Sequence, residues 1–225
     1  VRLTCPIGGR AIDLPMAPYV LGAWLGDGTT TNAGFTSADE EIVENIRSVG
    51  WAVRRSGRNK YKWIIGETVI AIRGRNGPGR VNTFRVRLSS MGLIGNKRVP
   101  AIYQRASMSE RLSLLQGLMD TDGSIDKNGQ AEYCSIIKSL AEDVHELVCG
   151  LGMKPVLSSG IARCQTGATA TRYRVTWTPT IPVFRLHRKL ARVKTAVRDV
   201  CRWRYIVRVD PIEPKPMRCI TVDAV

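Results

Sequence analysis

One nine-residue pattern occurs twice in this 225-residue chain, and it constrains the fold more than any other feature. Residues 20–28 read Val-Leu-Gly-Ala-Trp-Leu-Gly-Asp-Gly, and residues 115–123 read Leu-Gln-Gly-Leu-Met-Asp-Thr-Asp-Gly. Each copy is an apolar helical run that ends in an acid and a glycine. Positions i and i+4 share one face of a helix. Gly22 and Gly26 of the first copy therefore form a flat stripe where another backbone can approach.

The second copy carries the same stripe at Gly117 and Thr121, so the pattern predicts two helices packed along these small residues. That packing brings Asp27 and Asp122 together at the helices' C-terminal ends. The placement is unfavourable, because a helix C-terminus is partially negative and crowded carboxylates repel each other. A cation between the acids would relieve both effects. One copy alone would suggest a glycine-capped core helix, but two matched copies favour a paired-acid site.

The charge balance indicates a polyanionic partner. Lys and Arg number 34 against 19 Asp and Glu, which gives a net charge of +15 and a pI near 10.1. A field of that sign favours DNA, RNA or an anionic membrane surface. The sequence has no apolar run of about 18 residues and no signal-peptide pattern. We therefore expect no membrane association and an intracellular location, in the cytoplasm or nucleoid of the host cell.

The six cysteines show no C-x-x-C spacing, and only two histidines are present. This usage predicts free thiols in a reducing compartment and no structural zinc site.

Each motif is followed by a similar order of elements. After the first motif we predict a hairpin over residues 29–36 and an acidic-start helix from Asp39 to Gly50. Alternating basic and apolar residues from Trp51 to Ile72 predict antiparallel strands with one face in water. The alternation from Thr83 to Leu88 predicts a further strand.

The second half repeats this order. Its helix is predicted to start near Ser109, a capping candidate, and to run into the second motif. The elements predicted after it are strands at 131–135, 154–157 and 172–177, and helices at 139–151 and 185–200. The end of the tail, residues 219–222, reads as a strand.

The chain is thus predicted to be an α+β protein of two pseudo-symmetric αββαββα repeats. Their antiparallel sheets would form a basic saddle around the two packed motif helices. The predicted boundaries are a leading segment at 1–16, repeats at 17–105 and 106–208, and a linker or tail at 209–225. Antiparallel ribbons fit the major groove of B-DNA, where base edges are accessible.

The two motifs resemble those of the LAGLIDADG homing endonucleases, in the single-chain form that carries both copies. The match at 115–123 differs from the namesake pattern at Gln116, Met119 and Thr121, and the first copy has Leu25 in place of the more variable acid. The segments 13–28 and 217–223 are also similar to the flanks of an endonuclease domain within an intein. The resemblance therefore predicts an intein endonuclease whose tail leads towards a splicing domain.

The resemblance implies a site-specific double-strand DNA endonuclease that leaves short 3′ overhangs. Divalent metals held by carboxylates can activate water and stabilise the leaving oxygen of a phosphodiester. Mg²⁺ prefers hard oxygen ligands and retains several waters. We expect Asp27 and Asp122 to be metal ligands and catalytic residues, joined by the backbone carbonyls of Gly26 and Thr121. Mn²⁺ or Ca²⁺ could occupy the same sites.

The family often adds one basic residue per site, which helps to orient or activate the water. The resemblance implies Lys97 for the first repeat and Lys189 for the second, with Lys194 in reserve. A phosphate contact or a solvated charge is the plainer interpretation of each lysine.

Basic residues on the predicted strands are expected to bind double-stranded DNA, most through phosphates and a minority through base edges. They are Arg54, Arg55, Arg58, Lys60, Lys62, Arg73, Arg75, Arg80, Arg85, Arg87, Lys154, Arg163, Arg172 and Arg174. The protein is expected to be a monomer with internal pseudo-two-fold symmetry. The alternatives are a cleavage-inactive DNA- or RNA-binding protein on the same fold, such as a maturase or regulator, and an unrelated basic RNA-binding protein.

Overall fold

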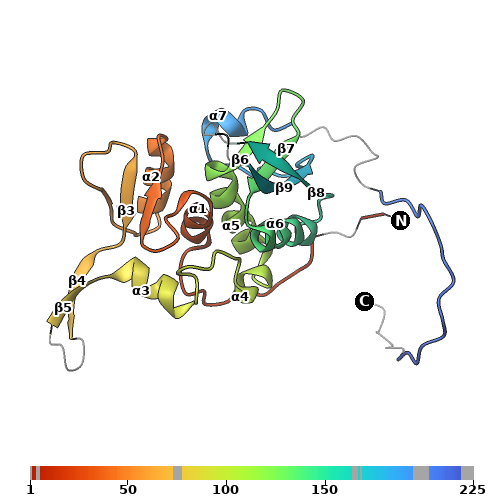
Figure 1. Cartoon of the computed structure of the whole chain (residues 1–225), viewed down its shortest axis with the longest axis horizontal. Coiled ribbons are helices and arrows are strands. Elements are labelled where there is room, and N and C mark those ends of the chain that lie inside the picture. The colour runs from red at the N-terminus through yellow and green to blue at the C-terminus, as the bar shows by residue number, and fades with distance from the viewer. Residues whose placement is uncertain are drawn as a thin grey trace.

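Two helices lie side by side at the centre of the computed structural model (Figure 1). They are α1 (Pro18–Asp27) and α5 (Met108–Thr121), the helices predicted from the two motifs. Tyr19 through Leu25 are all buried in α1, as expected for a helix that is apolar on every face. The structure describes residues 2–3, 6–72, 78–163, 167, 169–194 and 203–218.

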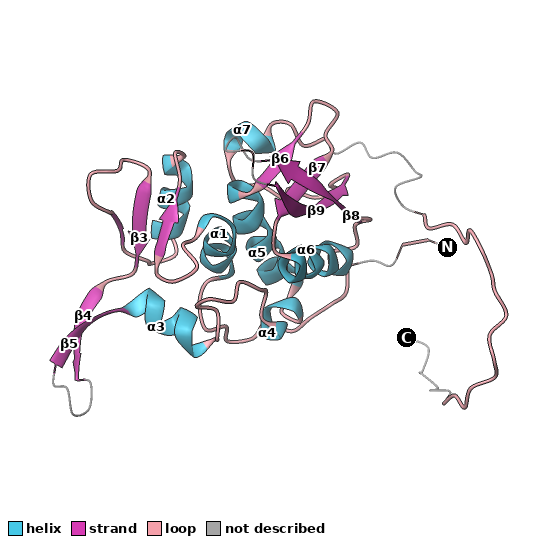
Figure 2. Ribbon diagram, viewed as in Figure 1, coloured by secondary structure: helices cyan, strands magenta, loops and turns pink. Residues whose placement is uncertain are grey.

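The first repeat forms one lobe of the molecule, with α1 at the edge that faces α5 (Figures 1 and 2). Its helix α2 buries Ile42, Val43 and Ile46 on one face, and its first turn carries acids that suit the helix N-terminus. The elements that follow α1 are β1 (Gly34–Thr36), α2 (Glu40–Arg47), β2 (Val53–Arg55), β3 (Lys62–Ile65), β4 (Thr68–Ile72), β5 (Pro78–Asn82) and α3 (Thr83–Ser90).

The short helix α4 (Ala101–Gln104) leads into the second repeat. A capping box opens α5: the side chain of Ser107 accepts a hydrogen bond from the backbone N–H of Glu110, whose carboxylate accepts from the backbone N–H of Ser107. The predicted cap at Ser109 was two residues late. The elements after α5 are β6 (Gly123–Ile125), β7 (Ala131–Ser135), α6 (Lys138–Gly150), β8 (Val156–Arg163), β9 (Thr169–Trp177) and α7 (His187–Leu190).

The described part of the chain contains three antiparallel sheets, and the two larger ones share one strand order. The second sheet runs β6-β7-β9-β8. The first runs β1-β3-β2, with an isolated bridge between Gly28 and Phe35 in the place of a strand equivalent to β6. The predicted α+β fold is confirmed, and the second repeat has the predicted αββαββα order. The first repeat departs from it through the single bridge and an added hairpin, β4-β5.

The predicted strand at Thr83–Leu88 was wrong, because these residues form helix α3. Asn82 caps this helix, and its side chain accepts a hydrogen bond from the backbone N–H of Arg85 at 2.8 Å. Phe84 and Leu88 lie four residues apart and are fully buried, whereas Val86 is 51% exposed. A strand would have placed all three apolar side chains on one face, but a helix buries only the two that share a face.

The predicted helix at 185–200 is much shorter in the described part of the chain, where α7 spans only four residues. Residues 195–202 and the predicted strand at 219–222 lie outside the described residues. Among the helices that the structure describes, none is long and apolar enough to cross a membrane.

Candidate active site and nucleic-acid interface

Small residues set the distance between the two central helices. A Cβ atom added at Gly22 would lie 2.1 Å from the carbonyl oxygen of Leu114, and one at Gly117 would lie 2.2 Å from that of Tyr19. A Cβ at Gly26 would lie 2.0 Å from Oγ1 of Thr121. Larger residues would therefore force the helices apart. The structure brings together the four small residues that the sequence predicted for this interface.

The same packing brings Asp27 and Asp122 together. Asp27 is the last residue of α1, and Asp122 is the C-cap of α5, with its N–H donating to the carbonyl of Leu118 at 3.0 Å. The two carboxyl groups lie close enough for each to shift the pKa of the other. Asp27 also lines a hollow of about 330 Å³ that opens between α1, α5 and the start of α2.

The environment of this pair disfavours two negative charges. One side of Asp122 is open to solvent. Even so, the protein atoms around this carboxyl remove much of its hydration and, with Asp27 alongside, raise its pKa to about 6. Burial also raises the pKa of Asp27, although Lys97 and Lys189 both favour its charged form. The pair is therefore an anionic site with too little compensating positive charge.

Lys97 reaches the pair from the loop between α3 and α4. Its side chain is buried, and its Nζ donates to the carbonyl oxygen of Gly26 at 2.6 Å. Nζ also lies 5.4 Å from the ring centre of Trp24. Burial lowers the pKa of Lys97, while Asp122 and Asp27 oppose that shift. This lysine therefore compensates the partial negative charge at the end of α1 and interacts electrostatically with both acids.

Lys189 holds the equivalent place at the end of α5. Its Nζ donates to three carbonyl oxygens: Met119 at 2.8 Å, Asp120 at 2.7 Å and Gly123 at 2.6 Å. An ammonium group has three donors, so all the donors of Lys189 are used. Burial, together with repulsion from Arg188, lowers its pKa to about 8. Lys194, the reserve candidate, instead packs its side chain beside Gly129.

A second set of polar residues, which the sequence did not predict, holds the end of α5 and the α7 segment that carries Lys189. Tyr19 donates its hydroxyl to the buried carboxylate of Asp120 at 2.8 Å. On α7, Arg188 forms two hydrogen bonds with the carboxylate of Asp39, at 3.1 and 2.7 Å. These contacts join residues about 100 or more positions apart in sequence, so no local pattern predicts them. Their only sequence signal is that Asp120 interrupts an otherwise apolar run.

The donor set at the acid pair fits a hard divalent cation. The two carboxylates are oxygen ligands, and the carbonyls of Gly26 and Thr121 lie at the same helix ends. The Gly26 carbonyl already accepts from Lys97, which leaves it one lone pair. Within the described ranges, no group of three or more His, Cys, Asp or Glu side chains is arranged to hold a metal ion. A cation bound here would therefore need further oxygen ligands from water or from a substrate.

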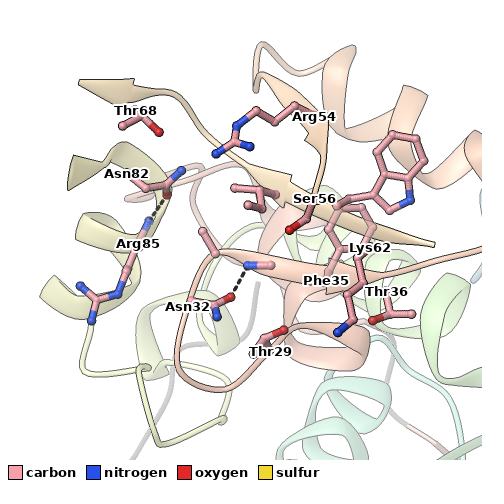
Figure 3. Close-up of a pocket in the computed structure, with 14 residues that line it drawn as sticks. Thr29, Asn32, Phe35, Thr36, Arg54, Ser56, Lys62, Thr68, Asn82 and Arg85 are labelled. Atoms are coloured by element: carbon pink, nitrogen blue, oxygen red, sulfur yellow. Dashed lines mark hydrogen bonds between the residues drawn. The ribbon is translucent and has the colours of Figure 1, made fainter. Parts of the chain in front are cut away.

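A groove of about 410 Å³, lined by both polar and apolar residues, lies over the first sheet (Figure 3). Three of the basic residues predicted to bind DNA line it: Arg54 from β2, Lys62 from β3 and Arg85 from α3. Neutral polar side chains also line it, including those of Thr36 and Ser56. The groove therefore presents donors and acceptors along the face of an antiparallel sheet.

The remaining predicted DNA-binding residues have varied surroundings. Arg55 pairs with Glu40 at 2.7 Å, and Arg174 pairs with Glu132 at 3.3 Å. Arg87, which α3 rather than a strand carries, bonds the carbonyl of Pro15 and is not among the groove's lining residues. The other exposed members are Arg58, Lys60, Arg80 and Arg163, while Lys154 and Arg172 are partly exposed and Arg73 and Arg75 lie outside the described residues.

Comparison with known proteins gives a match to a family model and similarity to curated proteins. Residues 109–180, which contain the second motif and most of the sheet after it, match the model of the LAGLIDADG-like domain. The chain is also similar to a replicative DNA helicase DnaB from Mycobacterium intracellulare, with 32% identity over 96% of this chain. That alignment covers 34% of the relative, so the chain spans about a third of the relative's length.

Among solved structures, the chain is similar to mesophilic variants of the homing endonuclease I-DmoI. The identity is 14% and the TM-score 0.46, over 79% of this chain and 86% of that chain. It is also similar to I-DmoI in complex with DNA and Mn, at 13% identity and a TM-score of 0.44, over 72% of this chain and 89% of that chain. The family match supports the resemblance stated from the second motif, because residues 109–180 are similar to the LAGLIDADG-like domain.

Proposed function

We propose that this protein is a site-specific homing endonuclease that hydrolyses both strands of DNA with a divalent metal ion. The observation that carries the proposal is the pair of acids, Asp27 and Asp122, at the ends of two packed helices, with buried lysines on either side. Placing like charges beside each other where hydration is reduced is costly unless a cation or a proton compensates them. A protein that only bound DNA would gain nothing from two carboxylates next to its phosphates.

In this proposal, Asp27 and Asp122 and the nearby backbone carbonyls would hold the metal together with phosphate oxygens of the DNA. Mg²⁺ suits such a site because it binds few protein ligands and retains several waters. The metal would lower the pKa of a bound water and stabilise the leaving oxygen. Lys97 and Lys189 would stabilise the negative charge that develops on the phosphate. Each motif would serve one strand, and staggered cuts would leave short 3′ overhangs.

The two sheets would hold the duplex. The groove over the first sheet places Arg54, Lys62 and Arg85 beside neutral polar side chains. This mixture suits contact with phosphates and with base edges. The net charge of +15 supports the same partner. The internal repeat supports action as a monomer, in which the two lobes meet the two halves of one target site.

We further propose that the chain is the endonuclease domain of an intein carried by a DnaB-type helicase. The relative is named as a replicative DNA helicase, yet the present sequence contains no Gly-Lys dipeptide and hence no P-loop for nucleotide hydrolysis. The aligned third of the relative is therefore better explained as an inserted domain than as the helicase motor. The target would then be the uninterrupted helicase gene at the insertion point.

The test is cleavage of a supercoiled plasmid that carries this joined sequence, incubated with the protein and Mg²⁺. The proposal predicts nicked and then linear plasmid, and at least roughly a 100-fold slower reaction for Asp27→Asn or Asp122→Asn. Both variants should still bind the target in a gel-shift assay. Glu142→Gln, a carboxylate-to-amide change on the exposed face of α6, is the matched control and should cut normally.

Two outcomes would contradict the proposal. If the wild-type protein binds the target but never cuts it, the protein is a binding module on this fold. If both asparagine variants cut at the normal rate, the assignment of the two acids is wrong.

A further inference from the structure

Two further carboxylates lie behind the active-site lysines, and neither belongs to the Asp27–Asp122 pair. Asp120 is 1% exposed and Asp143 is 8% exposed, and burial raises the pKa of both side chains. Both accept hydrogen bonds from backbone N–H groups of segments that carry a lysine. A buried carboxylate is expensive unless its oxygens are used, so these contacts indicate a specific role.

Asp120 takes part in a closed cycle of hydrogen bonds that joins α5 to the segment around α7. Its carboxylate accepts from the backbone N–H of Arg185, at 3.0 and 3.3 Å, and from that of Leu186 at 3.1 Å. The carbonyl of Leu186 in turn accepts from the backbone N–H of Lys189 at 3.0 Å. Nζ of Lys189 then returns to the carbonyl of Asp120 at 2.7 Å. One acid therefore fixes both the segment that carries Lys189 and one acceptor of its ammonium group.

Asp143 does the same for the other lysine, from the opposite repeat. Its Oδ2 accepts from the backbone N–H of Val99 at 2.7 Å, and its Oδ1 lies 3.6 Å from Arg98. Gln104 donates to its backbone carbonyl at 2.8 Å, so α6 holds both ends of the 98–104 segment. Lys97 stands at the start of this segment and reaches Gly26 on α1.

We propose that Asp120 and Asp143 are positioning residues, each of which fixes one active-site lysine, Lys189 and Lys97 respectively. The two motifs obtain this support differently. The second motif contains its own anchoring acid, whereas the first has Leu25 at the matching position. The lysine of the first site is held instead by an acid on α6 of the second repeat. The consequence for strand cleavage rests on the proposed function, whereas the positioning itself does not.

The test is the rate at which each lysine amine reacts with a small acylating reagent, read by mass spectrometry on the full chain without DNA or metal. In Asp120→Ala, the backbone N–H groups of Arg185 and Leu186 lose their acceptor. The segment that carries Lys189 should then separate from α5 more often. Labelling of Lys189 should then rise by roughly tenfold while Lys97 stays at the wild-type rate. Asp143→Ala should produce the reverse pattern.

Asn at either position keeps one acceptor oxygen and should restore wild-type labelling of that lysine. Tyr19→Phe is the matched control for Asp120, because it removes a donor to the same carboxylate but leaves the segment that carries Lys189 attached. Circular dichroism establishes that each variant is folded at the assay temperature. Should Asp120→Ala fail this criterion, Asp143→Ala decides the outcome, because in the described part of the chain the carboxylate of Asp143 accepts one backbone hydrogen bond. Unchanged labelling of the paired lysine, or an equal rise at both lysines, would overturn the proposal.

A second readout uses a target duplex with each strand end-labelled. Asp120→Ala and Asp143→Ala should each slow the cut on one strand, and the two variants should affect opposite strands. A general loss of stability would slow both cuts equally and would overturn the proposal. If labelling follows the predicted pattern but the wild-type protein never cuts, the proposed endonuclease function fails while the positioning stands.

Discussion

At the scale of single residues, the acid pair holds more negative charge than its surroundings favour. The pKa of Asp122 is raised to about 6, mainly by lost hydration and next by Asp27. A carboxyl whose folded-state pKa is raised weakens the folded state as pH rises through that pKa. At neutral pH without metal, the pair should therefore lower the stability of the protein.

Asp122→Asn should consequently raise the melting temperature of the metal-free protein at pH 8. The gain should shrink as pH falls below about 6, because the wild-type carboxyl then carries its own proton. Thermal unfolding in EDTA across this pH range measures the effect. Added Mg²⁺ should stabilise the wild-type protein at pH 8 and leave the variant nearly unchanged. A variant that is less stable than wild type at pH 8 would contradict this account of the pair.

The two lysines differ in how many of their donors the protein uses. Lys189 donates to three carbonyls, and Lys97 donates to one carbonyl in the described part of the chain. Lys189→Met leaves buried acceptors unpaired and should cost about 2–4 kcal/mol of stability. Lys97→Met should cost less stability and should slow cleavage more, since Lys97 has donors left for a phosphate or water. Urea unfolding and single-turnover cleavage of the two variants measure these effects, and equal losses in both assays would refute the distinction.

At the scale of elements, the contact between α1 and α5 depends on the absence of side chains at two glycines. Gly117→Ala should destabilise the protein by about 3 kcal/mol or more, because the new methyl group would overlap the backbone carbonyl of Tyr19. Gly160→Ala is the matched control, since nothing lies within 4 Å of a Cβ there. It should change the free energy of unfolding by no more than about 0.5 kcal/mol. Comparable losses of unfolding free energy in the two variants would mean that close packing of α1 and α5 does not cause the destabilisation.

The helices differ in whether the sequence alone could predict them. The two motif helices could be predicted, because the spacing of small residues and the terminal acids is a local pattern that occurs twice. Helix α3 could not, because six alternating residues fit a strand as well as a helix, and the cap at Asn82 decided between them. Lys97 and Lys189 were found through a family resemblance, whereas Asp120, Asp143 and Tyr19 depend on contacts between distant segments that no local spacing records.

At the scale of the whole molecule, the segments that carry Lys97 and Lys189 are each held by an acid of the opposite repeat. The segment after α3 is held by Asp143 on α6, and the segment at α7 is held by Asp39 at the start of α2. Each repeat therefore contributes to fixing the other's half of the site. Motion of one lobe should be transmitted to the lysine of the other, which suits an enzyme that must cut two strands at one place.

The basic surface as a whole predicts a steep dependence of DNA binding on salt. Each phosphate contact releases counterions, so a protein that neutralises roughly six phosphates should give a slope near −5 in log affinity against log salt. Fluorescence anisotropy with a labelled duplex measures this slope. Arg54→Ala should reduce its magnitude by about 1 if that side chain contacts a phosphate. A slope near zero would contradict the proposed binding surface.

In the proposed mechanism, two packed motifs supply one acid each to a metal-dependent site that cuts both strands of DNA. The most direct measurement is strand-resolved mapping of cleavage products on an end-labelled target, for the wild type, Asp27→Asn and Asp122→Asn. The account predicts staggered cuts with short 3′ overhangs in Mg²⁺, none in EDTA, and loss of cutting on at least one strand in each variant. Metal-independent cutting, or normal cutting of both strands by both variants, would contradict it.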